Sequence, residues 1–252
     1  MTATIDRGSA TSLVRPPAAS SPKPATKKPS RFTTSNGKKA VMAVTGAVMV
    51  LFLVGHVLGN LKMFSGPQAF NDYAEWLRTV GEPAVPRRTV LTLVEVVLAA
   101  AVILHMWSAI SLARRANKAR PVKYAAKRKN QASGYATHTM RFGGLIIVLF
   151  LVWHLLDLTF AVVNPAGPAG LPYDRMVQGF ALERWWVTVF YALSVIMLGL
   201  HLRHGLWSAF QTLGVGNARA RQGLSAGAAV FSLLLVAGFL AVPFAVMIGV
   251  LK

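Results

Sequence analysis

The chain has 252 residues, of which 54% are hydrophobic and only 14% are charged. This composition is typical of multi-pass membrane proteins rather than of soluble domains. The chain contains no cysteine, which excludes a disulfide, a covalently attached c-type haem and thiolate-bound iron–sulfur clusters from this chain itself. The net charge of +19 would suit nucleic acid, but the basic residues lie mainly in the tail and one loop, and no nucleic-acid-binding motif accompanies them.

Residues 1–40 are rich in Pro, Ser, Thr, Ala and Lys and contain a single acidic residue, Asp6. The segment has too little apolar surface to offset the entropy lost on ordering, so we expect a disordered basic tail. It lacks the apolar core and cleavage pattern of a secretory signal. A cytoplasmic tail is the simpler interpretation, and an organellar transit peptide is the alternative.

Five apolar stretches follow, near residues 41–62, 89–113, 142–163, 185–209 and 226–251. About 20 residues of helix cross the hydrocarbon layer, and each stretch is long enough. Backbone amides in lipid need internal partners, so the pattern predicts an all-α, five-transmembrane-helix bundle forming one domain over residues 41–252. A short helix is expected over 68–79, between prolines, and a turn-rich connector over 164–170.

Lysine and arginine residues in the flanks predict the orientation. With a cytoplasmic N-terminus, the tail and the inner loops hold nineteen basic residues and the outer loops hold six. We therefore expect a multi-pass protein of the cell membrane, with its N-terminus in the cytoplasm and Lys252 outside.

Four histidines lie inside four different apolar stretches: His56, His105, His154 and His201. Histidine is costly in hydrocarbon, so each needs a reason to be there. The octet around His56, Leu-Phe-Leu-Val-Gly-His-Val-Leu, returns around His154 as Leu-Phe-Leu-Val-Trp-His-Leu-Leu. The spacings of 98 residues from His56 to His154 and 96 from His105 to His201 indicate an internal two-helix repeat.

The expected depth of each histidine in the membrane follows from the direction of its helix and a rise of about 1.5 Å per residue. By this measure His56 and His154 form an outer pair, and His105 and His201 form an inner pair. Paired imidazoles suit haem iron, so the pattern predicts two b-type haems, one toward each membrane face. A single intramembrane histidine often forms only a hydrogen bond between helices. Four at matched depths make that simpler interpretation much less favourable.

Four further residues are candidates near these positions. Arg203 and His204 follow His201 closely and could bind haem propionates. Glu95 and Asp157 are the carboxylates that lie deep in apolar runs, which makes them candidates for a quinone contact or a proton relay. Asp157 lies three residues after His154.

The motifs resemble those of the membrane anchor of succinate:quinone oxidoreductases, in the single-subunit, five-helix, two-haem cytochrome b family. The resemblance covers about residues 38–251. In that family the axial histidine of the fourth helix precedes a glycine by four positions, which selects His201 over His204. The matching positions are His56 with Asn60, His105, Arg141 with Gly144, Trp153-His154 with Asp157, and His201-Leu-Arg-His-Gly205-Leu-Trp-Ser208.

The resemblance implies two haems b, with FAD and iron–sulfur clusters on a flavoprotein and an iron–sulfur subunit docked at the cytoplasmic face. Electrons from succinate would then pass to a membrane quinone, or in the reverse direction to fumarate. One departure is that Leu198, Gly199 and Leu200 precede His201, where some members carry a glutamate used in proton transfer.

Two alternatives remain at this point. One is a cytochrome b anchor of another respiratory dehydrogenase, which shares paired histidines but not the pattern around His201. The other is a haemless transporter with an internal repeat, although the apolar helices lack Gly/Pro-broken midpoints.

Overall fold

The computed structural model describes residues 34–119, 134–212 and 217–252. The expected disordered tail therefore lies mostly outside the described residues. The described chain is helical with connecting turns and contains no strand. Its long helices are α1 (Ser35–Leu61), α3 (Thr89–Lys118), α4 (Gly134–His154), α6 (Trp185–Thr212) and α7 (Ala218–Met247).

The prediction of five helices long and apolar enough to cross a membrane is confirmed for the described residues. Two boundaries differ from the sequence prediction. The first helix begins at Ser35 rather than near residue 41, because the Thr34 hydroxyl accepts a hydrogen bond from the Gly37 amide at 3.1 Å and caps the helix. The third apolar helix was expected to reach residue 163, but it ends at Thr159 after a π-helical turn, Leu155–Thr159.

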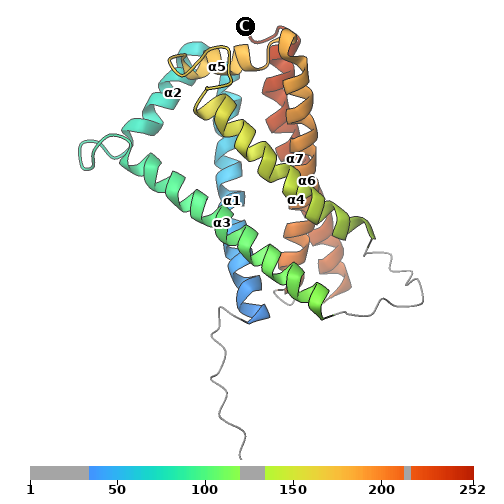
Figure 1. Ribbon diagram of the computed structural model, residues 1–252. Helices are drawn as coiled ribbons and strands as arrows, with labels where there is room; N and C mark the ends of the chain where they lie inside the picture. Colours follow the sequence, from blue (N-terminus) through green and yellow to red (C-terminus); the bar gives the residue numbers. More distant parts are fainter. Residues whose placement is uncertain (1–33, 120–133, 213–216) are drawn as a thin grey trace, which may run out of the picture.

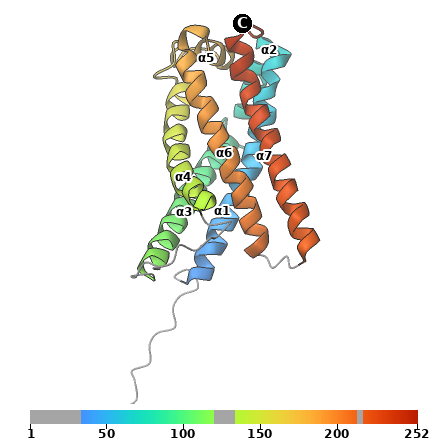
Figure 2. The same cartoon turned by 90° about the vertical axis from the view of Figure 1, so that its right-hand side faces the viewer.

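The long helices pack in a defined order (Figures 1 and 2). Helix α6 packs along α7 and α4, while α1 packs against α3 and α7. Figure 1 shows α3 slanting away from the other helices toward its N-terminal end. Apolar side chains on that half of α3 are largely exposed, as expected for a surface that faces lipid: Leu93, Val94, Val96 and Val97.

Two short helices lie together at one end of the structure, close to the C-terminus (Figure 1). They are α2 (Pro67–Thr79), which confirms the helix expected over 68–79, and α5 (Pro172–Gly179), which was not predicted. Each begins with a proline at its first turn, where the missing amide costs nothing. The Tyr173 amide donates to the Asn71 side chain at 3.0 Å and joins the two helices. We call this end the α2–α5 end.

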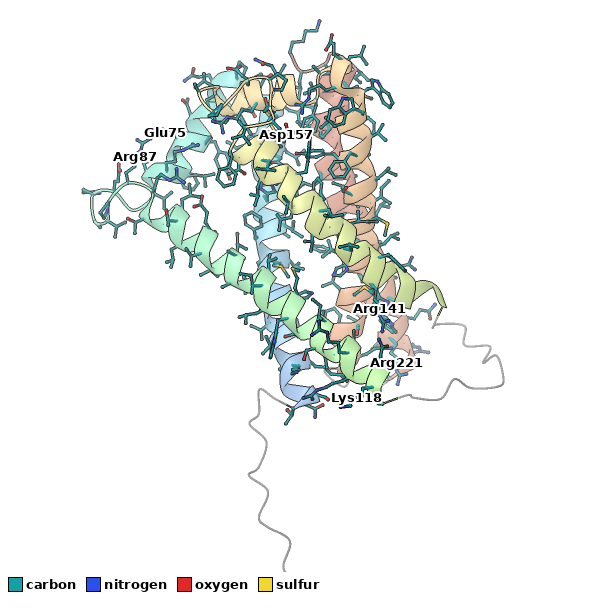
Figure 3. The ribbon with its side chains drawn as sticks, in the orientation of Figure 1. Glu75, Arg87, Lys118, Arg141, Asp157 and Arg221 are labelled. Atoms are coloured by element: carbon teal, nitrogen blue, oxygen red, sulfur yellow. The ribbon has the colours of Figure 1, made fainter. Side chains whose placement is uncertain are left out.

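The opposite end of the structure, where α1 starts and α3 stops, is basic and is called the basic end here. Figure 3 shows Lys118, Arg141 and Arg221 gathered there, while Asp157 lies at the α2–α5 end. All seven acidic residues of the described chain lie toward the α2–α5 end, on α2, α5, the adjoining loops or the neighbouring helix termini. This distribution agrees with the charge asymmetry used to predict orientation, while the side of a membrane on which each end lies stays a prediction.

Candidate functional site

The rings of His56 on α1 and His154 on α4 lie next to one another. Their centroids are 5.8 Å apart and their planes are nearly perpendicular, at 88°. Aromatic rings surround the pair: Phe52 stacks on His56, and Tyr191 meets His154 at 6.0 Å. The two histidines expected to form the outer pair are therefore brought together in an apolar environment.

The rings of His105 on α3 and His201 on α6 form a second pair, with centroids 6.3 Å apart and planes inclined at 58°. His105 also contacts α1, where its Nδ1 atom lies 3.1 Å from the carbonyl oxygen of Met42 and 3.3 Å from the Thr45 hydroxyl. A carbonyl oxygen can only accept a hydrogen bond, so Nδ1 carries the proton and Nε2 carries the lone pair.

The two histidine pairs lie at different levels along α1. The His105 pair is level with Met42 and Thr45, whereas His56 follows Thr45 by eleven residues. At about 1.5 Å of rise per residue, this spacing separates the two levels by about 16 Å along the helix. Both levels fit within a hydrocarbon layer of about 30 Å, one above the other.

Several features fit a planar group between the members of each pair. Two imidazoles bound on opposite sides of one metal ion place their ring centres about 6 Å apart, because each metal–nitrogen bond is about 2 Å long. The observed 5.8 and 6.3 Å agree with that spacing. Moreover, each pair joins helices, α1 with α4 and α3 with α6, that are not among the closely packed pairs of this structure.

Two further observations describe the surroundings of these rings. The Nδ1 atoms of His154 and His201 are buried without a hydrogen-bond partner. Beside Gly144 and Gly205, an added Cβ atom would meet nothing within 4 Å, so space is open there. Within the described segments no three His, Asp or Glu side chains gather as a metal site.

Asp157 lies one turn beyond His154 and is fully buried. Its Oδ1 atom accepts from the Arg184 guanidinium at 3.1 Å and from the Asn164 amide at 3.3 Å. Its Oδ2 atom accepts from the Tyr191 hydroxyl at 3.4 Å. The ring of Tyr191 also meets His154, so the same cluster links the buried ion pair to the histidine. These four residues are called the Asp157 cluster: Asp157, Asn164, Arg184 and Tyr191.

Two arginines bind backbone carbonyls at the π-helical turn that carries Asp157 and in the loop just after it. Arg175 donates to the carbonyls of Leu158 and Thr159, at 3.4 and 2.8 Å. Arg184 donates to the carbonyl of Val163 at 3.4 Å. Ala161 adopts a left-handed conformation, with φ of 55°, which ends the helix before the expected boundary at residue 163.

The remaining candidates occupy more peripheral positions. Glu95 is half-exposed and lies 3.4 Å from Arg88 rather than deep in an apolar run, because α3 begins only six residues before it. Arg203 is exposed and His204 is partly buried, and both lie within one turn of His201 on α6. Their contact with propionates and the quinone role of Glu95 stay predictions.

Sequence reasoning missed three residues that the structure brings to these sites. Arg184 was counted only as a basic flank residue, and its pairing with Asp157 across 27 residues had no local signal. Tyr191 was not singled out, although it contacts both His154 and Asp157. Thr45 lies eleven residues before His56, and only the packing of α1 against α3 shows that it meets His105.

Neither protein-family models, nor curated proteins, nor solved structures give a match to this chain. Its function is therefore argued from its own residues and their arrangement.

Proposed function

We propose that this chain is the cytochrome b membrane-anchor subunit of a succinate:quinone oxidoreductase and holds two b haems. The observation that carries the haem assignment is the presence of two histidine pairs at two levels, with ring centroids 5.8 and 6.3 Å apart. The succinate:quinone assignment rests on the motif resemblance around His56, His105, His154 and His201.

In this proposal His56 and His154 hold the haem at the α2–α5 end, and His105 and His201 hold the haem at the basic end. The haems supply one-electron transfer between a donor at one membrane face and a quinone in the membrane. The chain supplies ligation, burial and nearby charge, which set the potentials. Arg203 and His204, which follow His201 within one turn of α6, are the residues proposed to neutralise propionates of the haem at the basic end.

The Asp157 cluster bears on the proposed quinone and proton roles. The Asp157 carboxylate accepts hydrogen bonds from Arg184, Asn164 and Tyr191. The carboxylate is thus engaged in holding the end of α4 beside His154, which favours a positioning role over direct contact with a quinone. Glu95 is half-exposed and forms an ion pair with Arg88. Of the two carboxylates, it is the one that we retain as the candidate for a quinone contact or a proton relay.

The basic end is the proposed docking surface for an iron–sulfur subunit, to which a flavoprotein subunit binds in turn. Cationic surfaces steer and orient acidic partners, and they also attract anionic lipid. No acidic residue lies at this end among the described residues. An acidic partner surface would therefore not be repelled by negative charge on the described part of this chain.

The deciding measurement for the haem assignment is a dithionite-reduced minus oxidised visible spectrum of the purified chain, with the haem-to-protein ratio. The proposal expects two b haems per chain. A colourless, folded preparation that retains its partner subunits would contradict it and favour a haemless transporter or anchor.

A second measurement tests the partner. Arg114 and Lys118 lie at the basic end of α3, and replacing both with glutamine should weaken retention of soluble partner subunits, most of all at low salt, because salt screens exposed charges. The matched control replaces the exposed Arg87 and the C-terminal Lys252 at the α2–α5 end. Full retention of the soluble subunits in the Arg114/Lys118 variant would contradict the docking role. Identification of the retained subunits separates succinate dehydrogenase from another respiratory dehydrogenase.

A further inference from the structure

One of the four histidines differs from the others in how its ring is held. His105 Nδ1 lies within hydrogen-bond distance of the Met42 carbonyl and the Thr45 hydroxyl. In contrast, the Nδ1 atoms of His154 and His201 are buried without a partner. The ring orientation of His105 is therefore fixed by the chain itself, through contacts between α3 and α1.

The hydrogen-bond directions around Thr45 follow from the chemistry of each group. The Thr45 hydroxyl donates to the Val41 carbonyl at 2.7 Å, four residues back on the same helix. With its proton used there, its oxygen faces His105 Nδ1 at 3.3 Å as an acceptor. The Nδ1 proton of His105 is therefore shared between the Met42 carbonyl and the Thr45 oxygen, and Nε2 is left with its lone pair free.

We propose that Thr45 is a positioning residue for His105, which acts with the Met42 carbonyl to hold the Nδ1-protonated tautomer and the ring plane of His105. This inference rests on the proposed haem function and adds to it a residue that tunes one of the two haems. A hydrogen bond from the far ring nitrogen makes an imidazole a more basic ligand and fixes its orientation. A more basic ligand stabilises the oxidised iron and lowers the potential of that haem.

The contact between Thr45 and His105 is shielded from water. Thr45 is 7% exposed, so bulk water cannot replace its oxygen without a local rearrangement. Gly46 lies beside the same ring, where an added Cβ would come 3.5 Å from His105 Cε1, so the edge of the ring is closely covered by α1. The Met42 acceptor is backbone and cannot be removed by substitution, which makes Thr45 the side chain through which the interaction can be tested.

The test compares Thr45→Val, which keeps the shape and removes the hydroxyl, with Thr45→Ser, which retains a hydroxyl. Thr188→Val is the matched control, since Thr188 is also buried and its hydroxyl has no hydrogen-bond partner. The reduction potential of each haem is measured by spectroscopic redox titration of every full-length, haem-loaded variant. The haem that is missing from a His105→Ala variant is taken as the haem at the basic end.

We expect Thr45→Val to raise the potential of that haem and to shift its low-spin electron paramagnetic resonance signal, with the other haem unchanged. Thr45→Ser and Thr188→Val should match the original chain. Selective loss of the haem at the basic end in Thr45→Val would also support the inference, because the other haem reports an intact fold. Two unchanged potentials in Thr45→Val, or loss of both haems, would overturn it. An original chain without any haem would instead overturn the proposed function, and this inference with it.

Discussion

Arg184 reaches the fully buried carboxylate of Asp157 at 3.1 Å, although 27 residues separate them in the chain. The pair ties the start of α6 to the end of α4, one turn beyond His154. The Tyr191 hydroxyl lies 3.4 Å from the same carboxylate, and the Tyr191 ring meets His154 at 6.0 Å. An ion pair that is distant in sequence therefore supports the position of one histidine of the pair at the α2–α5 end.

Breaking this ion pair from one side should be strongly destabilising. Asp157→Asn leaves the Arg184 guanidinium, only 13% exposed, without its countercharge, and such a change costs about 3–5 kcal/mol. The double variant Asp157→Asn/Arg184→Gln removes both charges and should lose less than the sum of the single variants. The measurement is the free energy of unfolding in detergent. If the losses of unfolding free energy in the two single variants add up to the loss in the double variant, the two residues are not coupled.

Each histidine pair should hold one haem. His56→Ala and His154→Ala should each remove the same haem, and His105→Ala and His201→Ala should each remove the other, because one missing axial ligand frees the iron on that side. Redox titration of the remaining haem identifies which one is lost. His204→Ala removes a residue proposed to neutralise a propionate but no iron ligand, and it should retain both haems. Loss of one haem in His204→Ala with both retained in His201→Ala would reverse the choice between the two histidines.

Two arginines at the α2–α5 end should differ in their effect on stability. Arg175→Gln removes a guanidinium that donates to the carbonyls of Leu158, Thr159, Pro168 and Gly170, and it should cost about 1–3 kcal/mol. Arg87→Gln removes an ion pair with Glu75 in which both side chains are about half exposed, and it should cost about 1 kcal/mol or less. Thermal unfolding in detergent compares the two, and equal midpoints would contradict the role given to Arg175.

The absence of cysteine makes the predicted orientation directly testable. Ser65→Cys places one exposed thiol at the α2–α5 end, and Lys39→Cys places one at the basic end. A membrane-impermeant thiol reagent added to intact cells should label Ser65→Cys and should label Lys39→Cys only after permeabilisation. The reverse labelling pattern would place the N-terminus outside.

The number and nature of the long helices could be predicted from sequence because the constraint is local. A run of about 20 apolar residues in lipid has to satisfy its own backbone hydrogen bonds, and only the run itself decides that. The α2 helix was equally predictable, since Gly66-Pro67 marks its start. The end of the third apolar helix was not, because a π-helical turn and the left-handed Ala161 depend on carbonyls bound by Arg175 and Arg184.

The matching octets and the position of each histidine along its apolar stretch predicted, from sequence alone, which histidines should meet: His56 with His154 and His105 with His201. Helical rise is regular, so position along the chain converts to depth without knowledge of the packing. Tertiary structure alone decided what surrounds each ring. Thr45 meets His105, and Arg184 meets Asp157, because α1 packs on α3 and α6 packs on α4. Which side chains meet depends on the side of each helix that faces its neighbour. That side is determined by the packing of whole helices rather than by any short stretch of sequence.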